Sequence, residues 1–351
     1  MRPLCISARL AFASECLFAD TTVMPDLNIG GQAVIEGVMM RSADRISTAV
    51  RTADGQIVVQ SEEFRSLSTR YPWINTPVLR GAVAFVEMLL IGIRTLNFSA
   101  DISMQSVATM TSSGGTSDAA VVTQKRTHEA GNSPMLILTA IIAVGLGILI
   151  FFFTPIAVAS LFGIEKNAVG FNLLAGGIRL VMLVGYMLAI SMMKDVKRVF
   201  EYHGAEHKAI MTMENGGPLT AQRASESTRF HPRCGTSFLL IVALLAVMTY
   251  AVSDTLFAVI VERAPSLAER FLLHALLLPL IAGLSFELLK MSGRTRGHAL
   301  TKILIQPGLW LQRITTREPS LDQLEVAIVA LEEALRMPSS VPRTPYQSLI
   351  H

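Results

Sequence analysis

Residues 237–261 read SFLLIVALLAVMTYAVSDTLFAVIV, and this stretch decides the fold class. A helix needs about 20 mostly apolar residues to cross a bilayer, and Asp254 is the only charged residue in these 25 positions. The whole chain of 351 residues has the same bias, with 51% hydrophobic and 16% charged residues. Such a composition is too apolar for an ordinary soluble protein of this length. We therefore expect a mainly α-helical integral membrane protein.

Three further stretches are long and apolar enough to span a bilayer: 135–162, 171–193 and 271–289. Together with the first stretch they predict a four-helix transmembrane bundle. Pro155 interrupts one of them, and a bundled membrane helix tolerates this. Another carries a single cation, Arg179. A charge within a span usually has a partner, so Arg179 either pairs with Asp254 or extends to the nearby membrane surface.

The positions of Lys and Arg predict the orientation of the bundle. These residues collect between the second and third spans and after the fourth, whereas the loops at 163–170 and 262–270 carry few. Cytoplasmic loops are enriched in Lys and Arg. We expect a multi-pass protein of the bacterial inner (plasma) membrane with both termini in the cytoplasm. The formal net charge of +3 is too small to indicate nucleic-acid binding, so the lipid bilayer is the expected partner, beside an unknown substrate or protein.

The segment before the first span predicts a small β-containing unit and then a helix. Residues 46–52 alternate in polarity, Asp54-Gly55 supplies a tight turn, and alternation resumes at Ile57, which is typical of a β-hairpin. Residues 78–98 are apolar but carry a charge at every seventh position. This spacing predicts an amphipathic helix, either in the membrane plane or packed under the bundle.

The remaining polar segments complete the expected organisation. Pro307-Gly308 is expected to break the chain, and Ser320 with Gln323 forms a capping box at the start of a helix over 320–336. The predicted divisions are 1–24 disordered tail, 25–77 β-containing cytoplasmic unit, 78–100 amphipathic or bundle-packed helix, 101–133 flexible linker, 134–292 transmembrane bundle with a cytoplasmic loop at 194–236, and 293–351 cytoplasmic C-terminal segment.

The sequence EYHGAEHK at 201–208 is the strongest indication of chemistry. His203 and His207 are four residues apart, so on a helix they share a face and can bind one divalent ion. Glu206 can reach the same space. The order His-x-x-Glu-His is the inverted zinc-protease pattern, in which the Glu activates water. Glu214 lies seven residues beyond His207 and can return to that face as a further ligand.

The same loop contains a second pair of metal donors in HPRCGT at 231–236. His231 and Cys234 are both donors that zinc accepts, so with His203 and His207 they can close a four-ligand structural site. If only three protein ligands bind, an open position remains for water. Glu36, Glu87 and Glu287 are carboxylates in apolar surroundings, and each is a candidate extra ligand or ion-pair partner.

Several of these motifs together resemble the YqhQ-like family of bacterial membrane proteins, which are predicted metal-dependent enzymes. The resemblance rests on GGQAVIEGVMMR at 30–41, Arg80-Gly81 with Glu87, EYHGAEHK at 201–208, HPRCGT at 231–236, and 307–328 with its Gly-Leu-Trp-Leu-Gln and Glu-Pro sequences. It covers most of the chain after Met24. It implies the same candidate site and adds weight to Glu36. The residues that it points to are Glu36, His203, Glu206, His207, His231 and Cys234.

The leading functional hypothesis is therefore a metal-dependent membrane enzyme, for example a hydrolase, that uses zinc and has Glu206 as general base. The alternative is a non-enzymatic membrane scaffold or assembly factor with a structural zinc site. A transporter is the third hypothesis, but the sequence lacks the several intramembrane ionisable groups that are typical of a transport pathway.

Overall fold

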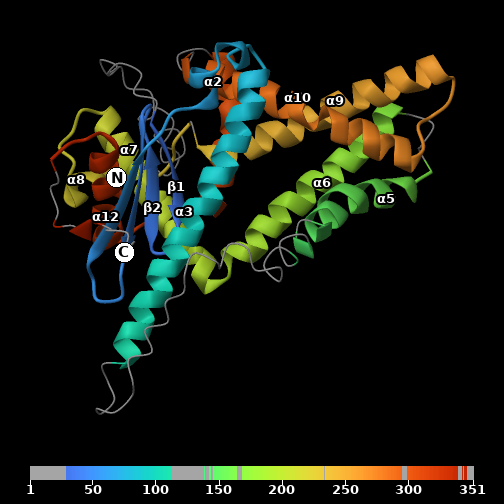
Figure 1. The fold of residues 1–351 in the computed structure, drawn as a ribbon. Coiled ribbons are helices and arrows are strands. Elements are labelled where there is room, and N and C mark those ends of the chain that lie inside the picture. Colours follow the sequence, from blue (N-terminus) through green and yellow to red (C-terminus); the bar gives the residue numbers. More distant parts are fainter. Residues whose placement is uncertain are drawn as a thin grey trace, which may run out of the picture.

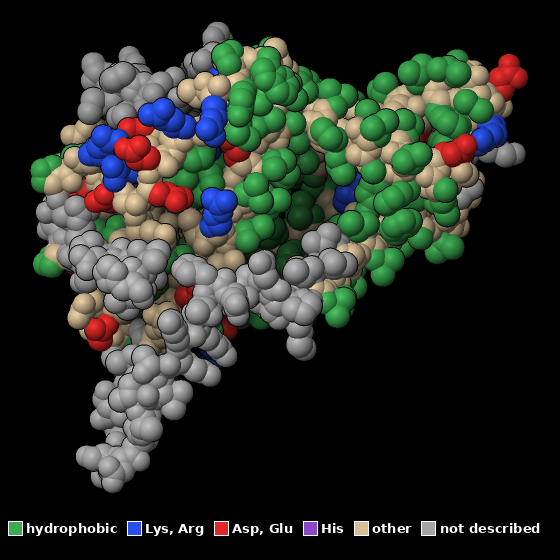
Figure 2. All heavy atoms as spheres, in the orientation of Figure 1, with side chains coloured by type: hydrophobic (Ala, Val, Ile, Leu, Met, Phe, Trp, Pro, Cys, Tyr) green, Lys and Arg blue, Asp and Glu red, His purple; other side chains and the backbone are tan. Residues whose placement is uncertain are grey.

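The computed structural model describes residues 29–112, 145–163, 168–232, 234–294 and 299–338, with short pieces at 138, 142–143, 342 and 344–345. The predicted tail at 1–24 lies outside these residues. A sheet-containing part lies at one end of the molecule, and long helices extend away from it (Figure 1). Hydrophobic side chains cover most of the visible surface of the extended helices, and charged side chains lie on the sheet-containing part and at the far tip of these helices (Figure 2).

The sheet is a meander of four antiparallel strands, joined at its edge by a short parallel fifth strand. The strands are β1 (Gly30–Val34), β2 (Gly37–Arg41), β3 (Arg45–Arg51), β4 (Ile57–Glu63) and β5 (Thr344–Pro345). The predicted hairpin is present, because β3 pairs with β4 in the register Val50 with Val58. Gly55 (φ 88°) allows its tight turn, and Glu36 (φ 53°) makes the left-handed turn between β1 and β2.

Helices cover both faces of this sheet. The alternation of side chains along a strand explains this, since Val38 and Met40 lie in one apolar core while Met39 lies in another, against Ile91. The first core is completed by α7 (Lys194–Glu214), α8 (Ala221–Glu226) and α12 (Leu321–Ala334). The second face is covered by α3 (Leu79–Ser112). α12 begins with the capping box that joins Ser320 and Gln323.

Among the described residues, three helices are long and apolar enough to cross a membrane: α6 (Ala168–Ser191), α9 (Gly235–Val261) and α10 (Leu267–Arg294). They correspond to three of the four predicted spans. The fourth, 135–162, falls partly outside the described residues, and its described part contains the π-helical turn η4 (Leu149–Phe153) and α5 (Thr154–Ser160). A bundle of four spans is therefore not established. The described residues form a mainly helical protein with three membrane-capable helices and a small sheet.

The partners of Asp254 and Arg179 differ from those that the sequence predicted. Asp254 is fully buried and accepts hydrogen bonds from Asn172 (2.8 Å) and His274 (3.0 Å), and it forms an ion pair with Arg270 (3.0 Å). Arg179 does not pair with it. Its Nε instead donates to the backbone carbonyl of Phe151 at 3.0 Å.

Two other sequence expectations are corrected by the structure. α3 continues to Ser112, so the first part of the predicted linker at 101–133 is helical, because Ile102 is buried under the sheet against Val34. The rest of that linker lies outside the described residues. Pro307 does not break the chain. It lies inside α11 (Ala299–Thr315), and the helix continues through it. The remaining short elements are α2 (Leu67–Arg70) and η2 (Pro72–Ile74).

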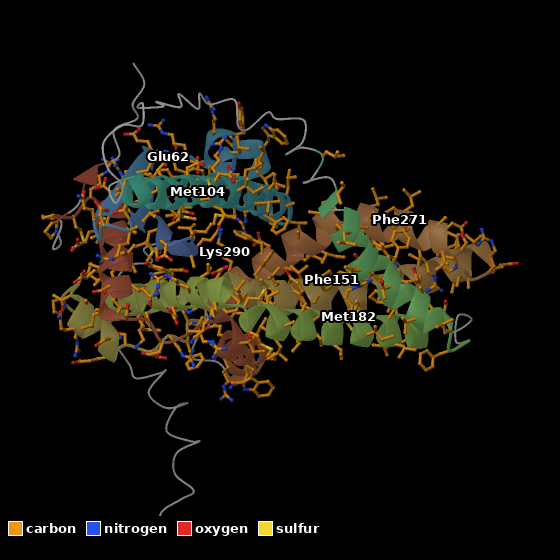
Figure 3. The ribbon with its side chains drawn as sticks, turned by 90° about the horizontal axis from the view of Figure 1, so that it is seen from below. Glu62, Met104, Phe151, Met182, Phe271 and Lys290 are labelled. Carbon is orange, nitrogen blue, oxygen red and sulfur yellow. The ribbon has the colours of Figure 1, made fainter. Side chains whose placement is uncertain are left out.

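The view from below shows the same division of the molecule (Figure 3). Glu62 and Met104 mark the sheet-containing end, and Phe151, Met182 and Phe271 mark the extended helices. Lys290, near the end of α10, lies between the two parts.

Candidate metal centre

The two histidines of the EYHGAEHK sequence lie one helical turn apart on α7. α7 begins only a few residues after the span α6 ends. The spacing of four residues brings the rings of His203 and His207 together, with 4.5 Å between their centroids. His207 is buried and His203 is half-buried. The helix therefore presents both imidazoles on one side, as the sequence predicts.

Cys234 reaches the histidines from the first turn of the span α9. It is the N-cap residue of that helix, and its Sγ accepts a hydrogen bond from the backbone N–H of Thr236 at 3.4 Å. The Sγ lies 3.2 Å from His203 Nε2. The positive end of a helix dipole favours a thiolate at this position, which is also the form that binds metal ions.

Backbone carbonyls orient both imidazoles. Nδ1 of His203 lies 2.8 Å from the carbonyl oxygen of Thr315, and Nδ1 of His207 lies 2.5 Å from that of Arg229. When Nδ1–H donates to a carbonyl, Nε2 is the free ligand atom, an arrangement typical of metal-binding histidines. Nε2 of His207 is buried and has no hydrogen-bond partner among the described residues. A buried nitrogen without a partner is costly unless a ligand uses it.

The spacing of these three side chains fits a single metal ion. One donor atom from each of His203, His207 and Cys234 lies within 4.8 Å of the other two. Zn–N and Zn–S bonds of about 2.0–2.3 Å in a tetrahedron hold their donors roughly 3.3–3.8 Å apart. Small side-chain movements therefore suffice to bring the three donors onto one ion.

The charges of the cluster also suit a cation. Burial opposes ionisation of the Cys234 thiol, but the neighbouring His207 and His203 outweigh it and hold the pKa of the thiol well below its usual value. Burial lowers the pKa of His203, yet the charge and hydrogen bond of Cys234 together raise it to about 9. Both pKa shifts favour a thiolate at Cys234 beside a protonated imidazole at His203. Metal binding would replace the imidazolium proton.

Glu206 lies beside the cluster and has an unused oxygen. Its side chain is buried against Gly31, where an added Cβ would lie 2.8 Å from Cγ of Glu206. Burial raises the pKa of its carboxyl group, although the nearby His207 and His203 lower it in part. Oε2 has no hydrogen-bond partner among the described residues. The carboxylate is therefore available to a ligand that shares this space.

His231 is close to the cluster but is engaged elsewhere. Its ring centroid lies 5.8 Å from that of His207, and its Nε2 lies 3.4 Å from a carboxylate oxygen of Glu214. Gln312 fixes its backbone, since the amide side chain accepts from the N–H of His231 and donates to its carbonyl. Neither His231 nor Glu214 belongs to the three-donor group. His231 lies next to His207, a member of that group.

Glu36 does not join the donor group. It lies at the turn between β1 and β2, and both of its carboxylate oxygens bind the Arg198 guanidinium on α7. The Tyr202 hydroxyl donates to the same carboxylate at 3.3 Å. Glu36 therefore forms an ion pair with Arg198, which precedes His203 by more than a helical turn. Glu287 likewise pairs with Arg80.

Glu87 has a structural role of the same kind. It accepts hydrogen bonds from the Ser66 hydroxyl and from the backbone N–H of Leu67. Sequence reasoning did not identify the groups that hold His203, His207 and His231 in place. Two of these, the carbonyls of Thr315 and Arg229, belong to the backbone and leave no signal in the side-chain pattern. The third, Gln312, lies in the Gly-Leu-Trp-Leu-Gln sequence. Its amide side chain is the one feature of the sequence that could have indicated such a role.

Comparison with known proteins agrees with the resemblance in the motifs. Residues 76–337 match the family described as "Protein of unknown function (DUF1385)". The chain is 33% identical over 326 residues to the uncharacterised protein YqhQ of Bacillus subtilis (strain 168), and the match covers 88% of this chain and 92% of that relative. No solved structure matches the chain.

Proposed function

The chain belongs to this YqhQ-like, DUF1385 family, and we propose that it is a membrane protein that binds a divalent metal ion through His203, His207 and Cys234. One observation carries the proposal. A buried imidazole nitrogen without a hydrogen-bond partner lies in the same small space as a second imidazole and a low-pKa thiol. Elements from two different parts of the chain meet there, α7 and the start of α9.

Zinc is the ion that this donor set favours. Thiolate and imidazole ligands together suit Zn²⁺, and two His with one Cys is a set found in catalytic zinc sites. Such a site keeps one coordination position open. When bound, the ion supplies Lewis acidity and lowers the pKa of water to about 7.

We further propose that the site is catalytic and that Glu206 is the general base of a hydrolytic reaction. The buried carboxylate has a free oxygen, and its raised pKa brings it nearer to the pH at which it can both accept and return a proton. His203 and His207 would hold the ion, and the carbonyls of Thr315 and Arg229 would fix the rings.

The alternative is a structural zinc site in a scaffold or assembly factor. It is favoured by the closeness of His231, whose ring lies 5.8 Å from that of His207. A rotation of His231 away from Glu214 would add a fourth donor and close the coordination shell. A closed shell leaves no position for water and therefore no hydrolysis.

The proposed setting is the bacterial inner membrane, with four spans and both termini in the cytoplasm. α6, α9 and α10 are three of these spans, and 135–162 would be the fourth. The excess of Lys and Arg around α7 and after α10 supports a cytoplasmic metal centre. Cys234 precedes the apolar span at Phe238 by four residues, about 6 Å along a helix, so the centre would lie at the membrane surface.

Cobalt substitution tests the proposal and separates its two forms. Co²⁺ added to chelator-treated protein is expected to give a thiolate-to-cobalt absorption band, which Cys234→Ser abolishes. Thr236→Ser, which keeps the neighbouring hydroxyl, is the matched control. Added cyanide should then change the ligand-field bands of an open three-ligand site and leave a closed four-ligand site unchanged. Absence of the charge-transfer band would contradict metal binding at Cys234.

A further inference from the structure

The N-terminal half of α3 exposes an apolar face that the sheet does not cover. Its exposed side chains recur at intervals of three and four residues, which places them on one side of the helix. They are large and between 41% and 54% exposed: Phe85, Val86, Leu89, Leu90, Ile93 and Leu96. Soluble proteins seldom leave so continuous an apolar strip on their surface.

The opposite face of α3 already accounts for the packing of this helix. Ile91 and Ile102 are buried against the sheet, and the Ser99 hydroxyl accepts a hydrogen bond from the backbone N–H of Ile35. An added Cβ on Gly92 would lie 2.6 Å from the side-chain oxygen of Gln32, so helix and strand are in close contact there. The apolar strip is therefore not needed for docking α3 onto the sheet.

The start of α3 packs against the C-terminal half of α10, a membrane-capable helix. Gly81 lies against Gly283 of α10, where an added Cβ would be 2.8 Å from the Gly283 carbonyl oxygen. Arg80 and Glu287 pair beside this contact at 2.5 Å. In Figure 1 the first half of α3 lies beside the ends of α9 and α10, and its second half runs away from them along the sheet.

Hydrophobic side chains cover the region of this first half, next to those of the extended helices (Figure 2). Charge follows the same division. From Gly81 to Ile93 the single charged residue is Glu87, which is 8% exposed and hydrogen-bonded to the chain. Exposed polar residues appear near the end of the apolar strip and continue beyond it: Arg94, Asn97 and Asp101.

We propose that the N-terminal half of α3 lies in the surface layer of the phospholipid bilayer, with the apolar strip from Phe85 to Leu96 in contact with acyl chains. Arg94 would extend its guanidinium to the phosphate groups. The inference rests on the proposed spanning of the membrane by α6, α9 and α10, and it is independent of the metal ion. In this position α3 would hold the sheet-containing part at the membrane surface, beside the proposed metal centre.

Fluorescence quenching by brominated lipids tests this placement. Both native tryptophans are replaced (Trp73→Phe, Trp310→Phe), and a single tryptophan is introduced as Leu89→Trp or Ile93→Trp. The full-length protein is placed in vesicles of phosphatidylcholine brominated on its acyl chains. Met248 is 60% exposed on α9, so Met248→Trp is the control for a side chain in contact with acyl chains. Gln60 is exposed on β4, so Gln60→Trp is the control for a side chain in water.

We expect loss of fluorescence for Leu89→Trp and Ile93→Trp that is comparable to the loss for Met248→Trp, with none for Gln60→Trp. If both α3 probes stay unquenched while Met248→Trp is quenched, the inference fails and the spans stand. Blue-shifted but unquenched emission would show that a second copy or another protein covers the strip, and it also overturns the inference. An unquenched Met248→Trp would overturn the spans themselves and this placement with them.

Discussion

Nε2 of His203 lies 3.2 Å from Sγ of Cys234, although the two residues are 31 positions apart in the chain. The contact joins the polar helix α7 to the first turn of the span α9. It exists because α7 follows α6 almost directly and the chain returns to the same end of the spans at Cys234. The candidate metal centre therefore lies at the point where the polar and the apolar parts of the molecule meet.

The zinc affinities of two histidine variants show whether three or four protein ligands bind the ion. We expect His207→Gln to weaken zinc binding by more than the roughly 10–100-fold that loss of an outer-shell partner costs. His231→Gln should stay within that smaller range, because His231 is outside the three-donor group. Competition with a chromogenic zinc chelator measures both affinities. Equal and large losses for the two variants would indicate four ligands and favour the structural site.

The position of Glu206 depends on a glycine, and this can be tested without changing any proposed ligand. A Cβ at Gly31 would lie 2.7 Å from the Met39 carbonyl oxygen and 2.8 Å from Glu206 Cγ. We expect Gly31→Ala to destabilise the fold by about 1–3 kcal/mol through overpacking, and to displace the Glu206 carboxylate. Thermal unfolding in detergent measures the stability.

Gly30→Ala is the matched control for this variant, since nothing lies within 4 Å of an added Cβ there. It should leave the unfolding temperature near that of the wild type. Equal behaviour of the two alanine variants would contradict the close contact between β1 and α7.

The buried charge cluster in the spans predicts a strong asymmetry between two ion pairs. Asp254→Asn removes the ion pair of Asp254 with Arg270, whose side chain is 2% exposed, and removal of one partner of a buried pair costs about 3–5 kcal/mol. Adding Arg270→Gln should recover part of this loss. Glu269→Gln breaks the exposed pair with Arg263 at the same end of the helices and should change the unfolding temperature little.

Thermal unfolding of these variants in detergent gives the comparison. The outcome that would contradict the structure is a destabilisation by Glu269→Gln that is as large as that by Asp254→Asn.

The low pKa of Cys234 predicts its reactivity in protein from which metal has been removed. Because the pKa of the thiol is lowered, the thiolate persists as the pH falls below the ordinary thiol pKa. Between about pH 9 and pH 7 an ordinary thiol with a pKa near 8.5 loses roughly 25-fold in alkylation rate. We expect a much smaller decrease for Cys234 in a Cys5→Ser, Cys16→Ser background, and protection by added zinc. A 25-fold decrease would show that the imidazoles do not stabilise the thiolate.

The sequence predicted those features that depend on local periodicity. The spans follow from long apolar runs, the hairpin at β3 and β4 from alternation around Asp54-Gly55, and the shared face of His203 and His207 from their spacing. The ion pair of Asp254 with Arg270 was not predicted, because Arg270 was counted as part of a loop and the two residues meet only when α9 and α10 fold back on each other. The ion pair that Glu36 forms was not predicted for a similar reason. Its partner Arg198 is 162 positions away.

The length of α3 and the continuity of α11 also needed tertiary information. Residues after 101 are rich in polar side chains, and Ile102 is buried because the sheet covers it. The local signal of Pro307-Gly308 was a helix break, but the helix continues through it. In both places packing outweighed local propensity.

Elemental analysis of detergent-purified protein tests the central claim most directly, with the wild type compared with a His203→Ala, His207→Ala double variant. The account predicts near-stoichiometric zinc in the wild type and its loss in the variant, with Gly30→Ala as a control that retains the metal. Absence of metal from all three proteins, or equal metal in all three, would contradict a metal centre at these histidines.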